Sequence, residues 1–298
     1  MNITRYIGKI FDAFSIDIGI DLGTANTLVY VRGKGIVLNE PTIVALNKKT
    51  NQLVAIGNDA KTMLGRTPSH IEVVRPLVHG VISDFEVTEE MLAYLITKVR
   101  SARRNIIAPR VLIGVPSGIT SVEMRAARDA ARNAGARDVL LVEEPIAAAI
   151  GAKLPIHKPQ GSMIIDIGGG TTDIAVISLG GIVTAKNLRI AGDQLNNDIV
   201  SYIRDQFKVL IGDKTAEDTK MTLASVEENG PTKEMIVRGR DVVTGLPREV
   251  VITDGDIREA ILGSVNAIVE AARDVIERTP PEVLADVMQK GITLAGGG

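Results

Sequence analysis

The chain has 298 residues, 45% of them hydrophobic, so it can bury a large core, and its length suggests two domains of ordinary size. The 34 Lys and Arg against 36 Asp and Glu, the 3% aromatics and the lack of Trp argue against a nucleic-acid-binding protein. The lack of Cys excludes a disulfide framework and a thiolate metal site, no apolar run approaches the ~18 residues of a spanning helix, and we expect a cytoplasmic protein.

Residues 1–15 form a predicted amphipathic helix. At the angular spacing of an α-helix, Arg5 and Lys9 fall on the polar side. The opposite side is apolar and carries Ile3, Tyr6, Ile7, Ile10, Phe11 and Phe14. Such a helix either lies in a membrane interface or packs on its own domain. Because it precedes the first core strand, we favour membrane binding, which one helix alone would make weak.

Two stretches with the same pattern are the centre of the sequence. Residues 16–31 read IDIGIDLGTANTLVYV, and residues 163–178 read MIIDIGGGTTDIAVIS. In each, an apolar strand ends in Asp, a Gly stands two positions later, and a Thr stands six positions later. The two Asp residues, Asp21 and Asp166, are 166 − 21 = 145 residues apart, about half the chain. This repeat predicts two similar domains whose glycine turns face each other across a cleft.

The composition of the second turn indicates a phosphate site. Glycines allow backbone N–H groups to approach an anion closely, and the Thr171 and Thr172 hydroxyls add donors. Carboxylates at both ends, Asp166 and Asp173, cannot bind phosphate directly. They suggest a divalent cation held between acid and phosphate, often through water.

The segment 39–79 contains three prolines and is predicted to be a small subdomain inserted in the first half. Asp84 then caps a helix that we expect to run to about Arg104. The basic end of this helix is followed by a loop with Ile106 and Ile107 at its tip. This tip is a second candidate membrane contact, and a loop packed against the core is the alternative.

A second carboxylate site follows. Residues 110–115 form a predicted strand, and Thr120 with Glu123 forms a capping box that opens the next helix. The strand 139–142 then leads into Glu144 at the start of a helix. Glu144 either complements the helix dipole or, at the carboxyl end of a strand, orients a water for attack on a terminal phosphate. We favour the second role.

The last third of the chain supplies further helices and a third glycine turn. A helix is predicted from Gly192 through Phe207, and another after Gly212 carries Glu217 and Lys220 three residues apart. These two side chains form either a surface ion pair or a contact with ribose and base. Two strands and long helices follow. The final predicted strand enters the turn 296–298.

Taken in order, these motifs resemble those of the actin, sugar-kinase and heat-shock-chaperone ATPase superfamily. The two Asp–Gly–Thr hairpins match its two phosphate motifs, the strand–Glu–Glu–Pro–helix its connecting motif, and the final turn its adenosine motif. Within it, residues 18–298 are similar to the MreB family of bacterial actins, through IDLGTANTLVY, GKGIVLNEP, MLGRTP, GVPSGIT, EEPIAAAIGA, DIGGGTTD, TAED and PPEV.

The resemblance implies an α/β, actin-like ATPase fold with ATP and Mg²⁺ in a cleft. Its two related βββαβα domains are domain I, residues 16–157, with an insertion at about 39–79, and domain II, residues 158–298, with an insertion at about 195–257.

The resemblance also implies site residues. The nucleotide would contact Gly23, Thr24, Ala25, Asn26, Gly168, Gly169, Gly170, Thr171, Gly192, Asp193, Glu217, Lys220, Gly296, Gly297 and Gly298. Asp21 and Asp166 would hold Mg²⁺, mainly through water. Glu144, with Thr171 and Asp166, would position the attacking water. The helix 1–15 and the tip at Ile106 and Ile107 resemble the family's membrane contacts.

The function implied is a cytoskeletal filament that hydrolyses ATP slowly on the inner face of the plasma membrane. Its partners would be other copies of itself, that membrane surface and the cell-wall synthesis and shape proteins. A sugar-type kinase on the same fold, with Glu144 or a neighbour as the base, is the first alternative. A chaperone-type ATPase is the second, but no peptide-binding domain follows.

Two features depart from the MreB pattern. Asp173 stands where the pattern usually has Glu, a change we expect to be tolerated. The chain stops directly after the third glycine turn, whereas MreB chains usually continue. We therefore expect a fragment of a longer protein, one that folds poorly or binds ATP weakly as given.

Overall fold

The computed structural model describes residues 17–101, 107–228 and 230–298. The predicted amphipathic helix, with Ile3, Ile7, Ile10, Phe11 and Phe14, lies outside the described residues, and so does Ile106 of the loop tip. Ile107 is described, and it is half-buried in a loop. None of the helices in these ranges has the length and hydropathy of a membrane span.

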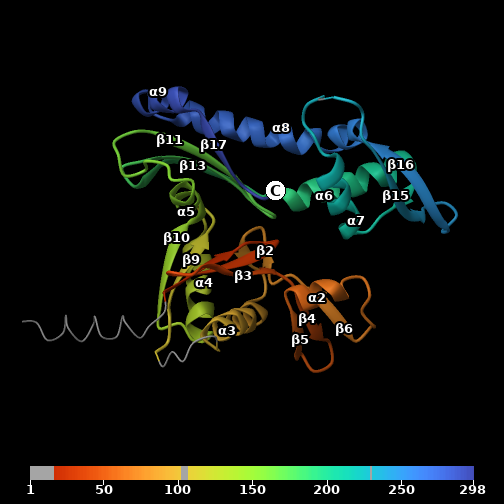
Figure 1. Ribbon diagram of the computed structural model, residues 1–298, viewed down its shortest axis with the longest axis horizontal. Coiled ribbons are helices and arrows are strands. Elements are labelled where there is room, and N and C mark those ends of the chain that lie inside the picture. Colours follow the sequence, from red (N-terminus) through yellow and green to blue (C-terminus); the bar gives the residue numbers. More distant parts are fainter. Residues whose placement is uncertain (1–16, 102–106, 229) are drawn as a thin grey trace, which may run out of the picture.

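The first half is built on a five-stranded sheet in the order β10-β9-β1-β2-β3 (Figure 1). Strands β1, β2 and β3 form an antiparallel meander. Strand β9 pairs with β1 in parallel, and β10 pairs with β9 in parallel. The strands are β1 (Asp17–Leu22), β2 (Asn26–Val31), β3 (Gly35–Pro41), β9 (Arg110–Val115) and β10 (Asp138–Glu143). Apolar side chains alternate along β1 and pack, in one core, against α3 (Phe85–Ser101) and α4 (Ser121–Asn133).

The second half repeats this plan. Its sheet has the order β13-β12-β11-β17, with an antiparallel meander whose first strand pairs in parallel with the last. The strands are β11 (Ser162–Ile167), β12 (Thr172–Ser178), β13 (Gly181–Leu188) and β17 (Ile292–Gly296). One face packs on α8 (Asp254–Arg278) and α9 (Pro281–Lys290). The shared meander-plus-parallel-strand plan agrees with the repeat seen in the sequence.

The helix α5 (Glu144–Gly151) connects the two halves. It begins directly after β10, and Ala149 packs with Ile164, Ala175 and Ile177 of the second sheet. The expected boundary of domain I at residue 157 therefore falls after a helix that packs mainly on the second half.

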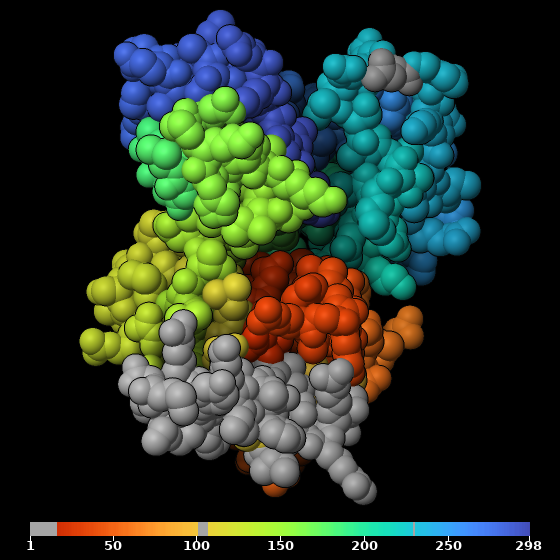
Figure 2. Space-filling model, turned by 60° about the vertical axis from the view of Figure 1, so that its left-hand side comes forward, coloured from red at the N-terminus to blue at the C-terminus, as the bar shows by residue number. Residues whose placement is uncertain are grey.

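Each half carries an insertion with its own small core. The first has a β5-β4-β6 sheet, with β4 (Val44–Asn47), β5 (Leu53–Ile56), α2 (Asn58–Met63) and β6 (Ile71–Val74), followed by the hairpin β7 (Leu77–Val78) and β8 (Val81–Ile82). The second has a β14-β15-β16 sheet, with α6 (Gly192–Tyr202), η1 (Ile203–Phe207), β14 (Val209–Leu210), α7 (Asp213–Leu223), β15 (Glu234–Asp241) and β16 (Pro247–Thr253). Figure 2 shows this second insertion as a separate lobe, with a hollow between it and the rest of the second half.

One predicted cap is confirmed, and one helix end differs from the prediction. Both groups of the Thr120–Glu123 capping box are in place at the start of α4. The helix expected through Phe207 is regular only to Tyr202, because its last residues form a π-turn that ends at Lys208 in a left-handed conformation. The helix expected to reach about Arg104 is described to Ser101.

Candidate functional site

The two glycine turns lie against each other between the halves. A Cβ added at Gly169 would come 2.5 Å from the Cβ of Ala25, and one added at Gly170 would overlap the Thr24 side chain. Only glycine allows this approach. The structure therefore brings together the residues predicted for the two phosphate turns, from Gly23 through Asn26 and from Gly168 through Thr171.

The first turn is held by hydrogen bonds to its own half. The Thr42 hydroxyl donates to the Gly23 carbonyl at 2.6 Å, and the Thr42 backbone N–H donates to the Ala25 carbonyl at 2.9 Å. The Gly80 N–H donates to the Thr24 hydroxyl at 2.9 Å. These bonds fix the turn before any ligand arrives, which reduces the entropy that binding would cost.

The second turn is held by α6. The backbone N–H groups of Gly192 and Asp193, at the start of that helix, donate to the carbonyls of Gly168 (3.1 Å) and Gly169 (2.7 Å). Within the turn, the Gly168 N–H donates to the Thr171 carbonyl at 2.8 Å. Gly192 and Asp193 therefore lie at the predicted site, where they support the turn with their N–H groups.

The third glycine turn, residues 296–298, contacts the strand end just before the second turn. The Gly298 N–H donates to the Ile167 carbonyl at 2.9 Å, and a Cβ at Gly296 would overlap that same carbonyl. Gly296 has a φ of +95°, which favours glycine. The prediction that the turn 296–298 joins the phosphate turns is consistent with this geometry.

Lys220 on α7 also reaches this point. Its ammonium group donates to the Gly192 carbonyl at 3.0 Å. Burial lowers the pKa of Lys220, while the charges of Glu217 and Asp193 act in the opposite direction. Lys220 thus donates to the backbone beside the second turn, so it lies at the predicted nucleotide site.

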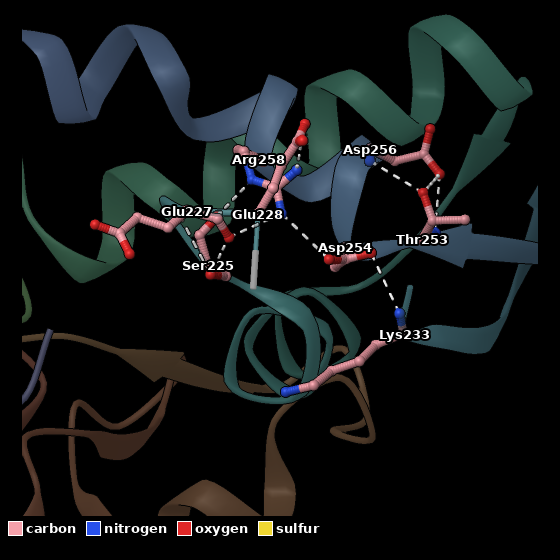
Figure 3. Close-up of polar contacts among 8 residues, drawn as sticks. All are labelled: Ser225, Glu227, Glu228, Lys233, Thr253, Asp254, Asp256 and Arg258. Carbon is pink, nitrogen blue, oxygen red and sulfur yellow. Dashed lines mark hydrogen bonds and ion pairs between the residues drawn. The ribbon is translucent and has the colours of Figure 1, made fainter. Parts of the chain in front are cut away.

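Arg258 of α8 holds the loop that follows α7 (Figure 3). Its guanidinium donates to the carbonyls of Ser225 (3.2 Å) and Glu227 (3.1 Å) in the loop that follows α7, and to the Asp254 carboxylate at 3.2 Å. This loop is therefore attached to the first turn of α8.

Acidic side chains gather beside the two phosphate turns. A Cβ at Gly114 would lie 3.5 Å from Cγ of Glu144 and 3.8 Å from Oδ1 of Asp21. Burial, together with the charges of Asp21, Asp173 and Asp166, raises the pKa of Glu144 to about 9. Burial, with Asp21 and Asp173, raises the pKa of Asp166 to about 6. Loss of solvation among the surrounding protein atoms raises the pKa of Asp21 as well, although part of its side chain is exposed to solvent.

This cluster suits a divalent cation. Repelling carboxylates raise each other's pKa values, and a bound cation reverses that effect. In the part of the chain that is described, no group of three or more His, Cys, Asp or Glu side chains is arranged to hold a metal by itself. Asp21 and Asp166 fit Mg²⁺ held by one or two carboxylates, with phosphate oxygens and water completing the shell.

Asp173 differs from the other acids. Its Oδ1 accepts from the backbone N–H (2.9 Å) and hydroxyl (2.5 Å) of Ser117, and its Oδ2 accepts from Asn187 at 2.8 Å. The carboxylate that the sequence suggested as one of two cation neighbours thus has both oxygens occupied by protein donors.

Sequence reasoning also missed Arg75 and His79. Arg75 pairs with Asp193 of α6 at 3.0 Å, and Nδ1 of His79 lies 3.4 Å from the Gly170 carbonyl. His79 and Gly80 are two consecutive left-handed residues that turn the chain here, and the sequence offered no clear signal for either contact.

The family model for MreB/Mbl protein matches residues 15–298. The chain belongs to the MreB/Mbl family. It is 50% identical over 285 residues to the cell shape-determining protein Mbl of Bacillus subtilis (strain 168), covering 96% of this chain and 85% of the relative. It is 49% identical over 296 residues to the cell shape-determining protein MreB of Pasteurella multocida (strain Pm70), covering 97% and 84%.

The solved structures agree with the MreB/Mbl assignment. MreB5 of Spiroplasma citri bound to ADP has a TM-score of 0.90 and 42% identity, covering 95% of this chain and 85% of that one. The same protein bound to AMPPNP gives 0.90 and 43%. The actin-like ATPase fold expected from the motifs is confirmed, and the matches favour MreB/Mbl over a sugar-type kinase.

Proposed function

We propose that this chain binds ATP between its halves as an actin-like cytoskeletal protein that determines cell shape. The observation that carries the proposal is the meeting of three glycine turns, from both halves, beside Asp21, Glu144 and Asp166. The relatives support it, since Mbl and MreB are named cell shape-determining proteins and MreB5 binds ADP and AMPPNP.

Mg²⁺ would be held by Asp21 and Asp166 together with phosphate oxygens. It would supply positive charge that neutralises the phosphates and lowers the pKa values of the nearby acids. Glu217 and Lys220 of α7 would contact ribose and base, and the turn 296–298 would lie under the nucleotide.

Glu144 would position the water that attacks the terminal phosphate. It stands at the carboxyl end of β10, where ligand crevices form in α/β sheets, and its side chain lies beside Asp21. Thr171 and Asp166, which belong to the second half, would help to position that water. Catalysis of this kind depends on positioning and on electrostatic stabilisation, without a covalent intermediate.

A direct test is Glu144→Ala in the full chain. Binding of ATP, measured by equilibrium titration, should be kept, while phosphate release should slow about 10²-fold, the usual range for a positioned acid or base. Turnover equal to that of the unaltered chain would remove Glu144 from the mechanism.

We further propose that the chain forms filaments on the inner face of the plasma membrane, in the cytoplasm, where they guide cell-wall synthesis and shape proteins. The membrane contacts would be the segment 1–15 and the loop tip at Ile106 and Ile107. ATP-dependent pelleting with and without anionic liposomes tests both points. Removal of residues 1–15 should reduce co-sedimentation with liposomes, and undiminished co-sedimentation would assign that segment to packing.

A further inference from the structure

Ser117 and Asp173 form a buried bridge between the two halves of the molecule. Asp173 is 1% exposed and Ser117 is 6% exposed. Two donors from Ser117 and one from Asn187 occupy both carboxylate oxygens, at distances of 2.5 to 2.9 Å. A buried carboxylate with three donors is held in one geometry, since losing a donor would leave the charge poorly compensated. We refer to this contact as the Ser117–Asp173 bridge.

Each residue of the bridge lies on a segment next to a proposed catalytic carboxylate, Glu144 or Asp166. Ser117 follows β9, whose Val115 pairs with Glu143, the residue before Glu144. Asp173 lies on β12 directly opposite Asp166 of β11. The bridge therefore connects the backbone that carries Glu144 to the backbone that carries Asp166.

Two other polar contacts between the halves are more exposed or longer. The Arg75–Asp193 pair has side chains that are 39% and 31% exposed, so water competes with it. The contact between His79 and the Gly170 carbonyl is 3.4 Å long. Among these contacts in the described part of the chain, the Ser117–Asp173 bridge is the one that both lies out of solvent and has short hydrogen bonds.

We propose that the Ser117–Asp173 bridge is a positioning interaction for ATP hydrolysis. It fixes the distance between Glu144 and the second phosphate turn, so it controls the rate of the chemical step more than the affinity for nucleotide. The three glycine turns are held by their own hydrogen bonds and keep the nucleotide in place. A displacement of about 1 Å is enough to cost a large factor in rate. This inference rests on the proposed function.

The test uses Ser117→Ala, which removes the hydroxyl but keeps the backbone N–H donor to Asp173. Single-turnover ATP hydrolysis and the equilibrium affinity for a non-hydrolysable ATP analogue are measured on the full chain. Hydrolysis should slow about 10-fold while the affinity changes less than about 3-fold. Ser117→Thr, which keeps a hydroxyl, should restore most of the rate. Arg238→Ala, on the exposed Arg238–Glu249 pair of the far insertion, is the control.

A double substitution shows whether the bridge acts through Glu144. In a Glu144→Gln background, Ser117→Ala should cause no further loss of rate, because the group that it positions is already gone. If circular dichroism shows that Ser117→Ala is unfolded, Asp173→Asn takes its place. This variant removes the charge at nearly constant shape and should give the same loss of rate with little change in affinity.

The outcomes separate the two proposals. An unaltered chain that binds but never hydrolyses ATP would overturn the hydrolytic function and the inference with it. An unaltered chain that hydrolyses ATP, with Ser117→Ala equally fast, would overturn the inference alone. Equal losses of rate and affinity, or losses that add in the Glu144→Gln background, would also overturn it.

Discussion

Glu144 should destabilise the empty protein at neutral pH, and Glu144→Gln should relieve this. The pKa of this carboxyl rises from 4.5 to about 9 because it is buried beside Asp21, Asp173 and Asp166. Between these two values the folded chain keeps a proton that the unfolded chain has lost. The free energy of unfolding therefore falls as pH rises through that window.

The magnitude follows from the same shift. Each pH unit corresponds to about 1.4 kcal/mol, so three units, from pH 4.5 to about pH 7.5, give about 4 kcal/mol. Water reaches the partly exposed side chain, and we take about half, ~2 kcal/mol. For a 298-residue chain this corresponds to a rise of about 3 °C in Tm for Glu144→Gln.

Thermal unfolding without nucleotide or Mg²⁺, at about pH 7.5 and about pH 4.5, measures this effect. The gain in Tm should be present at the higher pH and nearly absent at the lower one, where the carboxyl is protonated in the folded state and about half protonated in the unfolded state. Glu143→Gln, the adjacent acid outside the cluster, is the matched control. A gain of equal size at both pH values, or a loss at the higher one, would refute the electrostatic explanation.

Three further substitutions test the site and its support. Gly170→Ala should push the Thr24 side chain away and weaken nucleotide affinity about 10-fold in equilibrium binding; unchanged affinity would show that the turns need not touch. Gly263→Ala, exposed on α8 with no atom near the added Cβ, should raise the free energy of unfolding by about 0.5–1 kcal/mol in urea, and a decrease would contradict this. Arg258→Ala should speed protease cleavage between Ser225 and Glu228, whereas equal cleavage would mean that the loop is held by other contacts.

Local signals in the sequence were enough to predict most of the site. The Asp–Gly–Thr pattern at Asp21 and Asp166 depends on strand, turn and strand following one another, which are short-range properties. The capping box at Thr120 is equally local. The repetition of the pattern 145 residues later then predicted that the two turns face each other, and the family resemblance supplied the nucleotide contacts at Gly192, Asp193 and residues 296–298.

The parts that escaped prediction depend on contacts between distant segments. Ser117 and Asp173 are 56 residues apart and belong to different halves. The GVPSGIT segment that contains Ser117 supports the family resemblance, but it does not indicate which residue Ser117 contacts. The packing of α5 on the second sheet and the π-turn after Tyr202 are likewise set by tertiary packing.

The contrast between Asp173 and its acidic neighbours explains how the site couples stability to its ligand. Asp173 receives three hydrogen bonds from the protein, so its charge is compensated whether or not a ligand is present. The pKa values of Glu144 and Asp166 are raised by burial and by the neighbouring carboxylates, and that of Asp21 by loss of solvation, with no hydrogen bond acting in the opposite direction. Their compensation must come from outside, and a cation bound with phosphate would provide it. A ligand that binds only the folded state stabilises that state. The rise in Tm on adding Mg²⁺ with ATP should therefore be larger at about pH 8 than at about pH 5, and Glu144→Gln should reduce that difference.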